Sequence, residues 1–148
     1  MIKPFPDEFF MSMALKEAMM ALQEEEIPIG SVIVAKNQIV GRGYNQVERL
    51  HDVTAHAEII ALTAASNFFN NKYLSGCTIY VTIEPCMMCA AAIGWAQIER
   101  VVYGASDPKK GFTLFTPSPL HPKAIVETNV MNDECAELLG QFFRKKRK

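Results

Sequence analysis

Two short groups of residues have the types and spacing to do chemistry together. The first is His56-Ala57-Glu58, and the second is Pro85-Cys86-Met87-Met88-Cys89. Two thiolates and one neutral imidazole form a borderline-soft ligand set that suits zinc. Three protein ligands leave a fourth tetrahedral position for water, which is typical of a catalytic zinc site and not of a structural one. We therefore expect His56, Cys86 and Cys89 to hold one zinc ion.

The acidic residue of the first group has a separate task. Glu58 follows His56 by two residues, which is about 200° around an ideal helix, so the two side chains would not stack on one helix face. A carboxylate placed in this way can take a proton from the water at the metal and pass it to a substrate nitrogen. Because two thiolates neutralise the ion's charge, that water needs a base beside it. Glu58 is the predicted catalytic residue.

Each group taken alone has a simpler explanation. A Cys-x-x-Cys pair can be a redox pair, a lone histidine is usually a satisfied side chain, and a lone helix glutamate is usually solvated. Taken together, the two groups match the H-x-E…P-C-x-x-C signature of zinc-dependent nucleobase deaminases. Cys77 and Cys135 lie outside this signature, and we expect both in the core.

The elements that must position these residues alternate between helix and strand. Apolar residues at helical spacing predict four helices, at residues 7–23, 55–65, 86–97 and from 132 to the basic end. Runs rich in β-branched residues predict five strands, at residues 29–35, 39–45, 78–82, 100–104 and 125–129. Asp52 or Thr54 would cap the second helix and Asn132 the last. The order indicates an α/β fold in a single domain, residues 1–148, with helices covering a mixed sheet.

Composition narrows the class of protein. The chain has 148 residues, of which 49% are hydrophobic and 21% charged, as in an ordinary globular domain. The longest apolar run, residues 86–96, has 11 residues, which is too short to span a membrane. Such an apolar helix is either covered on most sides or lies at a subunit contact. Without a secretory signal or a disulfide-rich pattern, we expect a cytoplasmic protein that uses no membrane.

Charge is distributed unevenly along the chain. Residues 1–143 carry 10 basic and 16 acidic side chains, whereas the last five residues are all basic. Aromatic rings followed by cations can bind an RNA loop by base stacking and phosphate contact, although many basic ends are only solvated. The predicted RNA-binding residues are Phe142, Phe143, Arg144, Lys145, Lys146 and Arg147.

Over nearly its whole length, the chain resembles the tRNA-specific adenosine deaminases of the TadA type, within the cytidine deaminase-like superfamily. The similar stretches are Gly41–Asn45, Thr54–Ile59, Tyr80–Ala90, Arg100–Ala105, Glu134–Ala136 and Phe142–Arg144.

The resemblance implies a three-layer α/β/α sandwich with a mixed five-stranded sheet of the cytidine deaminase-like type. It also implies one Zn²⁺ per subunit, no organic cofactor, and a homodimer with active sites near the subunit contact. The implied reaction is hydrolytic deamination of the wobble adenosine, A34, in a tRNA anticodon loop to inosine. By position, Asn45 would contact the substrate and Asp107 the nucleotide or its ribose. A turn residue and a helix cap, respectively, are the alternatives.

One stretch departs from the family pattern. Residues 112–119, FTLFTPSP, replace a small, glycine- and alanine-rich stretch of typical members. If this loop lines the pocket, its bulk could select another purine, which makes a guanine deaminase acting on the free base the alternative function. A non-catalytic module, in which zinc only stabilises an RNA-binding or redox domain, is the alternative from another class. A free-base enzyme needs neither a basic tail nor Asn45, so we favour tRNA.

Overall fold

The helices and strands follow one another in the predicted order. A computed structural model describes residues 4–147. Its helices are α1 (Asp7–Gln23), α2 (Val47–Leu50), α3 (Ala57–Phe69), α4 (Met87–Trp95) and α5 (Asn132–Lys146), with a 3₁₀ turn η1 (Phe112–Leu114). Its strands are β1 (Gly30–Ala35), β2 (Gln38–Tyr44), β3 (Thr78–Ile83), β4 (Arg100–Ala105) and β5 (Ile125–Glu127). None of the helices within these residues is long and apolar enough to cross a membrane.

The five strands form one mixed sheet in the order β2-β1-β3-β4-β5. Strand β1 is antiparallel to both of its neighbours, whereas β3, β4 and β5 are parallel. Only β1 therefore runs in the opposite direction. The carboxyl ends of the other four strands lie at one edge of the sheet, which we call the carboxyl edge, together with the amino end of β1.

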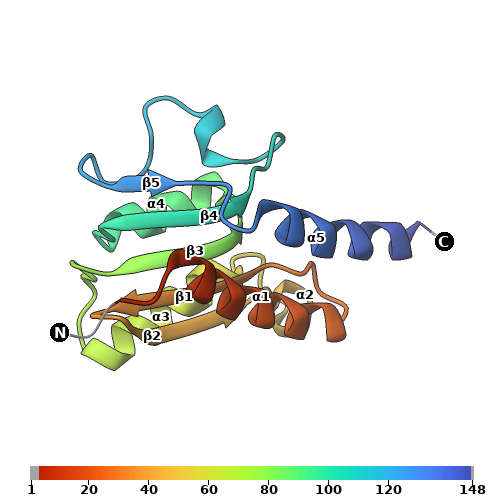
Figure 1. The fold of residues 1–148 in the computed structure, drawn as a ribbon, viewed down its shortest axis with the longest axis horizontal. Helices are drawn as coiled ribbons and strands as arrows, with labels where there is room; N and C mark the ends of the chain where they lie inside the picture. The colour runs from red at the N-terminus through yellow and green to blue at the C-terminus, as the bar shows by residue number, and fades with distance from the viewer. Residues whose placement is uncertain (1–3, 148) are drawn as a thin grey trace.

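Helices cover both faces of the sheet. Helices α3 and α4 lie on one face, and α1 and α5 on the other (Figure 1). Because successive strand residues point to opposite faces, Ile33 and Ile79 join the core beneath α3 and α4, whereas Val32 and Val102 join the core beneath α1 and α5. The predicted three-layer α/β/α sandwich is confirmed.

Close contact with the sheet sets the position of α3. A Cβ atom on Gly43 of β2 would lie 2.3 Å from the carbonyl oxygen of Ala57 and 2.7 Å from the backbone nitrogen of Ala61. Only glycine lets the helix backbone approach this closely. The first turn of α3, which carries Glu58, is therefore held against β2.

Three details of the predicted helix ends are wrong. Helix α3 begins at Ala57, and His56 precedes it as an extended N-cap residue. Asp52 caps no helix, because its Oδ1 accepts hydrogen bonds from Thr54 N–H and Oγ1 at 2.8 and 2.7 Å. Asn132 is the first residue of α5, and its N-cap is Met131 in the left-handed region, without a side-chain cap. Local turn geometry, and not the side chain that could cap, decided where these helices begin.

Candidate metal centre

Two of the three predicted metal ligands occupy the same position at the start of a helix. His56 is the N-cap residue of α3 and Cys86 the N-cap residue of α4, both with extended backbones. Cys89 lies in the first turn of α4. The partial positive charge of a helix N-terminus favours a thiolate. Because β2 and β3 both end at the carboxyl edge, the chain brings the two helix starts together there.

The distances between the three side chains fit a zinc ion. His56 Nδ1 lies 3.7 Å from Cys86 Sγ and 3.4 Å from Cys89 Sγ, and all three ligand atoms lie within 4.8 Å of one another. Tetrahedral zinc, with Zn–S near 2.3 Å and Zn–N near 2.0 Å, places sulfur and nitrogen about 3.6 Å apart. The residues therefore fit zinc, with Nδ1 as the imidazole ligand, and the predicted set comes together as expected.

The two thiols differ in acidity. The pKa of Cys86 is lowered to about 4, chiefly because the Cys89 thiol donates a hydrogen bond to it and also because of His56. The pKa of Cys89 is raised by the same hydrogen bond and by burial. The pKa of His56 is raised, chiefly by its hydrogen bond with Cys86, and the charge of Lys110 opposes this rise. Zinc binding must therefore displace the proton that Cys89 retains.

Glu58 lies beside these sulfurs in a buried position. Only 4% of the residue is exposed. Its pKa is raised to about 7, chiefly because burial disfavours the charged form, and the negative charge of Cys86 adds to the rise. A carboxyl group with a pKa in this range can both accept and release a proton near neutral pH. This is the property that the predicted catalytic role requires.

The two predicted substrate contacts both take part in turns at the carboxyl edge. Asn45 follows β2, where its amide group donates to Ile27 O at 3.3 Å and accepts from Val47 N–H at 3.3 Å. Asp107 follows β4, and its Oδ1 accepts from the backbone N–H of Lys109 and Lys110 at 3.0 and 3.1 Å. Asn45 has the turn role that the sequence left open, whereas Asp107 binds a turn at residues 108–110 and does not cap a helix. Both lie on loops at the same sheet edge as the metal ligands.

Two further carboxylates at this edge were missed by the sequence reasoning. Glu26, just before β1, accepts hydrogen bonds from the N–H groups of Glu48 and Arg49 at 3.1 and 2.7 Å. Glu84, just after β3, is 4% exposed and binds the loop that follows β4. Their partners lie more than 20 residues away in the chain, and no short motif signals such a contact.

The large apolar side chains of the atypical loop 112–119 differ in burial. Phe112 is buried and packs edge-on against Tyr103, with ring centroids 6.1 Å apart. Leu114 and Phe115 are exposed. The loop follows the carboxyl end of β4, but its largest buried ring fills the hydrophobic core.

The aromatic residues of the predicted RNA-binding end differ in exposure. Phe142 is 8% exposed, with Lys146 Nζ 5.6 Å from its ring centroid, whereas Phe143 is 43% exposed. Arg144 pairs with Glu137 at 2.9 Å on the surface. A buried ring offers no free face for stacking, so Phe142 packs the helix and Phe143 presents the available ring.

One imidazole and two cysteine sulfurs lie together beside a buried carboxyl group at the edge of an α/β/α sandwich. This combination is typical of zinc-dependent nucleobase deaminases. Residues 5–105 match the model of the cytidine and deoxycytidylate deaminase zinc-binding region. A tRNA-specific adenosine deaminase of Agrobacterium fabrum is 43% identical over 143 residues, which are 93% of this chain and 94% of the relative. The chain belongs to this deaminase family and, within it, to the tRNA-specific adenosine deaminases.

Two solved structures add to this assignment. One, from a study of A-to-I editing by tRNA:A34 deaminases at the wobble position, has a TM-score of 0.83 and 40% identity, and covers 88% of this chain and 98% of that chain. A guanine deaminase from Bacillus subtilis has a TM-score of 0.66 and 36% identity, and covers 69% of this chain and 66% of that chain. The similarity to the tRNA:A34 structure extends further along both chains.

Proposed function

We propose that this protein converts adenosine to inosine at position 34 of a tRNA anticodon loop by hydrolytic deamination. The observation that carries the proposal is the cluster of His56, Cys86 and Cys89, with ligand atoms within 4.8 Å of one another, next to the buried Glu58. The choice of tRNA is supported by the relatives, which align over nearly their whole length.

In the proposed mechanism, Glu58 moves the protons. Zinc, when bound, supplies a Lewis acid that makes water acidic enough to react at neutral pH. Glu58 takes a proton from the attacking water and delivers it to N1 of the adenine as oxygen adds to C6. It then takes the remaining proton from the new hydroxyl group on C6 and gives it to the amino group, so that the C6–N bond breaks and the C6 carbonyl forms. The products are inosine and ammonia, and the pKa of about 7 suits both transfers.

Two turn residues complete the proposed substrate site. Asn45 and Asp107 lie on loops at the same sheet edge as the metal ligands. An Asn side chain has two acceptor sites and two donors, so the two hydrogen bonds of Asn45 within the protein leave capacity for a base or ribose. We assign Asn45 to the nucleotide and Asp107 to its ribose.

The C-terminal helix is the proposed surface for the anticodon loop. Helix α5 extends away from the body of the molecule (Figure 1), and its exposed end carries Phe143, Arg144, Lys145, Lys146 and Arg147. Lys148 lies outside the described residues. Deleting residues 144–148 should weaken binding to an anticodon stem-loop and reduce the slope of log Kd against log salt. Unchanged affinity and slope would identify a solvated end.

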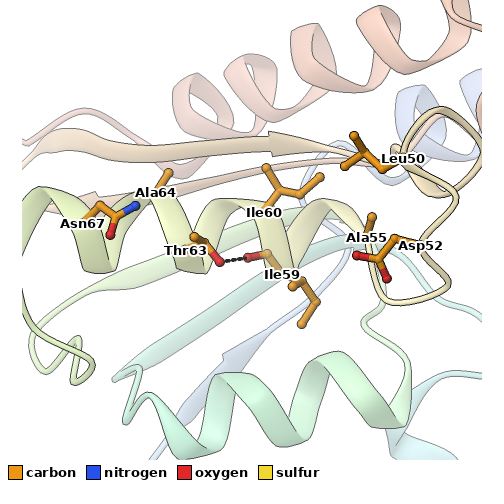
Figure 2. Close-up of a pocket in the computed structure, with 8 residues that line it drawn as sticks. All are labelled: Leu50, Asp52, Ala55, Ile59, Ile60, Thr63, Ala64 and Asn67. Atoms are coloured by element: carbon orange, nitrogen blue, oxygen red, sulfur yellow. Dashed lines mark hydrogen bonds between the residues drawn. The ribbon is translucent and has the colours of Figure 1, made fainter.

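A second copy of the chain is the proposed partner for the outer face of α3 and α4. Trp95 is 83% exposed and Met87 45%. A separate groove runs along α3 (Figure 2), lined by Leu50, Asp52, Ala55, Ile59, Ile60, Thr63, Ala64 and Asn67. An apolar face of this kind marks an interaction surface. Trp95→Lys should shift a dimer to monomer in light scattering, and a wild-type monomer would contradict the proposal.

One assay ranks the candidate activities. Ammonia release should be seen with an A34-containing anticodon stem-loop and not with free guanine or cytidine. Release from guanine alone would favour the alternative enzyme. Glu58→Ala should abolish turnover and keep the zinc and the fold, whereas a non-catalytic zinc module would show no turnover in either form. We place this reaction in the cytoplasm and assign it to one domain, residues 1–148.

A further inference from the structure

The loop after β4 lies directly against a metal ligand. The backbone N–H of Phe112 donates to Pro85 O at 2.9 Å, and Gly111 forms an isolated antiparallel bridge with Cys86. The loop also closes on itself, because Gly111 N–H donates to Asp107 O at 3.0 Å. Residues 107–113 therefore form a compact loop in contact with the turn that presents Cys86.

Glu84 holds both ends of this loop. Its Oε1 accepts a hydrogen bond from Asp107 N–H at 3.1 Å, and its Oε2 accepts from Thr113 N–H at 3.0 Å and Thr113 Oγ1 at 2.8 Å. The backbone of Glu84 is itself fixed, because its N–H donates to Ala105 O at 2.8 Å. A carboxylate buried to this extent is costly unless its oxygens are hydrogen-bonded, and the loop supplies the donors.

Gly111 shows how closely the loop surrounds this side chain. A Cβ atom at this position would lie 2.1 Å from Glu84 Oε2. No residue other than glycine fits there without displacing the carboxylate. The arrangement is thus specific to a glutamate at 84 and a glycine at 111.

The loop carries residues that bear on the substrate. Asp107 is the proposed ribose contact, and Lys110 is an exposed cation. Lys109 is a second exposed cation on the same loop. A displaced loop would move these groups relative to the nucleotide, and small displacements of positioning groups have large effects on catalysis.

We propose that Glu84 is a positioning residue for substrate binding: it fixes the 107–113 loop against the Cys86 turn, so that the loop forms one wall of the nucleotide site. This inference rests on the proposed function for the identity of the substrate. The chemistry that the wall meets is a ribose and its phosphates, which Asp107, Lys109 and Lys110 can bind.

The test compares three variants with the wild-type zinc protein. Glu84→Gln keeps the shape but replaces one acceptor oxygen with a donor. Thr113→Val removes only the hydroxyl donor, and Thr113→Ser restores it. Glu99→Gln, at an exposed position before β4, is the matched control.

For Glu84→Gln, we expect KM for an A34 stem-loop to rise at least about tenfold, the change equivalent to one buried hydrogen bond, with a smaller change in kcat. Thr113→Val should raise KM less, and Thr113→Ser should return it to the wild-type value. Glu99→Gln should leave KM unchanged. Loss of kcat alone, with KM unchanged, would overturn the proposal and indicate a purely structural residue.

A second measurement does not depend on activity. Hydrogen exchange should be faster at residues 107–113 in Glu84→Gln and in Thr113→Val, with β3 and β4 unchanged and one zinc per chain retained. If the wild type fails to deaminate the stem-loop, the proposed function fails, yet faster exchange still supports the loop assignment. Unchanged exchange in both variants rejects it, whatever the substrate. Should Glu84→Gln fail to fold, Thr113→Val decides.

Discussion

Three glutamates at the carboxyl edge are almost equally buried but have different surroundings. Glu26, Glu58 and Glu84 are 2%, 4% and 4% exposed. Glu26 accepts hydrogen bonds from backbone N–H groups of α2, and Glu84 from those of the loop after β4. Glu58 instead lies among the sulfur ligands, and its pKa rises to about 7, mainly through burial. Burial alone therefore does not distinguish the three side chains; their neighbours do, because Glu26 and Glu84 bind backbone N–H groups of distant segments and Glu58 lies beside the metal ligands.

The largest effect, a loss of kcat, is expected for substitution of Glu58. Glu58→Gln removes the proton carrier and keeps the side-chain volume, so kcat should fall roughly 10²–10⁴-fold, the range typical of general acid–base catalysis. The zinc content should remain one per chain. Glu8→Gln, on the exposed side of α1, is the control. If Glu58→Gln retained kcat, the assignment of Glu58 as the proton carrier would be wrong.

The next largest effect concerns the backbone that keeps Glu58 buried. Gly43→Ala would place a methyl group 2.3 Å from Ala57 O, and overpacking of this kind costs about 1–3 kcal/mol. Both the free energy of unfolding, from chemical denaturation, and the activity should fall. In Gly140→Ala the new atom meets the end of the flexible Arg144 side chain, so stability should hold or rise. Equal behaviour of the two variants would contradict the close contact between α3 and β2.

A loss of stability with little loss of activity is expected at a carboxylate that serves only as an acceptor. Glu26→Gln leaves one of the N–H groups of Glu48 and Arg49 without its acceptor, which costs roughly 1–3 kcal/mol for a buried group. Thermal unfolding should detect this loss. The kcat of the zinc-loaded variant should change far less than that of Glu58→Gln. A 100-fold loss of kcat here would remove the distinction between the two kinds of glutamate.

The smallest effect is expected at a carboxylate near the surface. Hydrogen bonds from Arg100 and Tyr80 lower the pKa of Asp7, with the Arg100 bond the largest cause. Because the folded-state pKa lies below the unfolded value, Asp7 stabilises the fold above about pH 4, and this contribution disappears as the pH falls through the folded-state pKa. Asp7→Asn should cost at most about 1 kcal/mol at pH 7, since the pair is partly exposed. Urea unfolding at pH 7 and pH 3 tests this, and a pH-independent difference would contradict it.

Strong local patterns made most of the fold predictable. Buried Phe10, Ala14 and Ala18 follow the helical spacing of α1, and each predicted strand is found within a few residues. The metal ligands were predictable because zinc chemistry restricts both residue type and spacing. Helix α2, with four residues, has too few positions to show a period.

The missed features depend on contacts between distant parts of the chain. Glu26 reaches α2 across 22 residues and Glu84 reaches Thr113 across 29, so neither has a signal in its own neighbourhood. At the start of α5, the sequence offered Asn132 as the N-cap residue. The N-cap is instead Met131, whose backbone is in the left-handed region. The residue type shows which caps and hydrogen bonds a side chain can form, but the packing of the folded chain determines which of them it does form.

The reversed direction of β1 concentrates the chemistry at one end of the molecule. At the other end lies the turn between β1 and β2, where Lys36 and Asn37 both have positive φ, as in a tight two-residue hairpin. A linker inserted at this turn would emerge on the side opposite the metal ligands. A second domain fused at this turn would therefore leave the carboxyl edge uncovered.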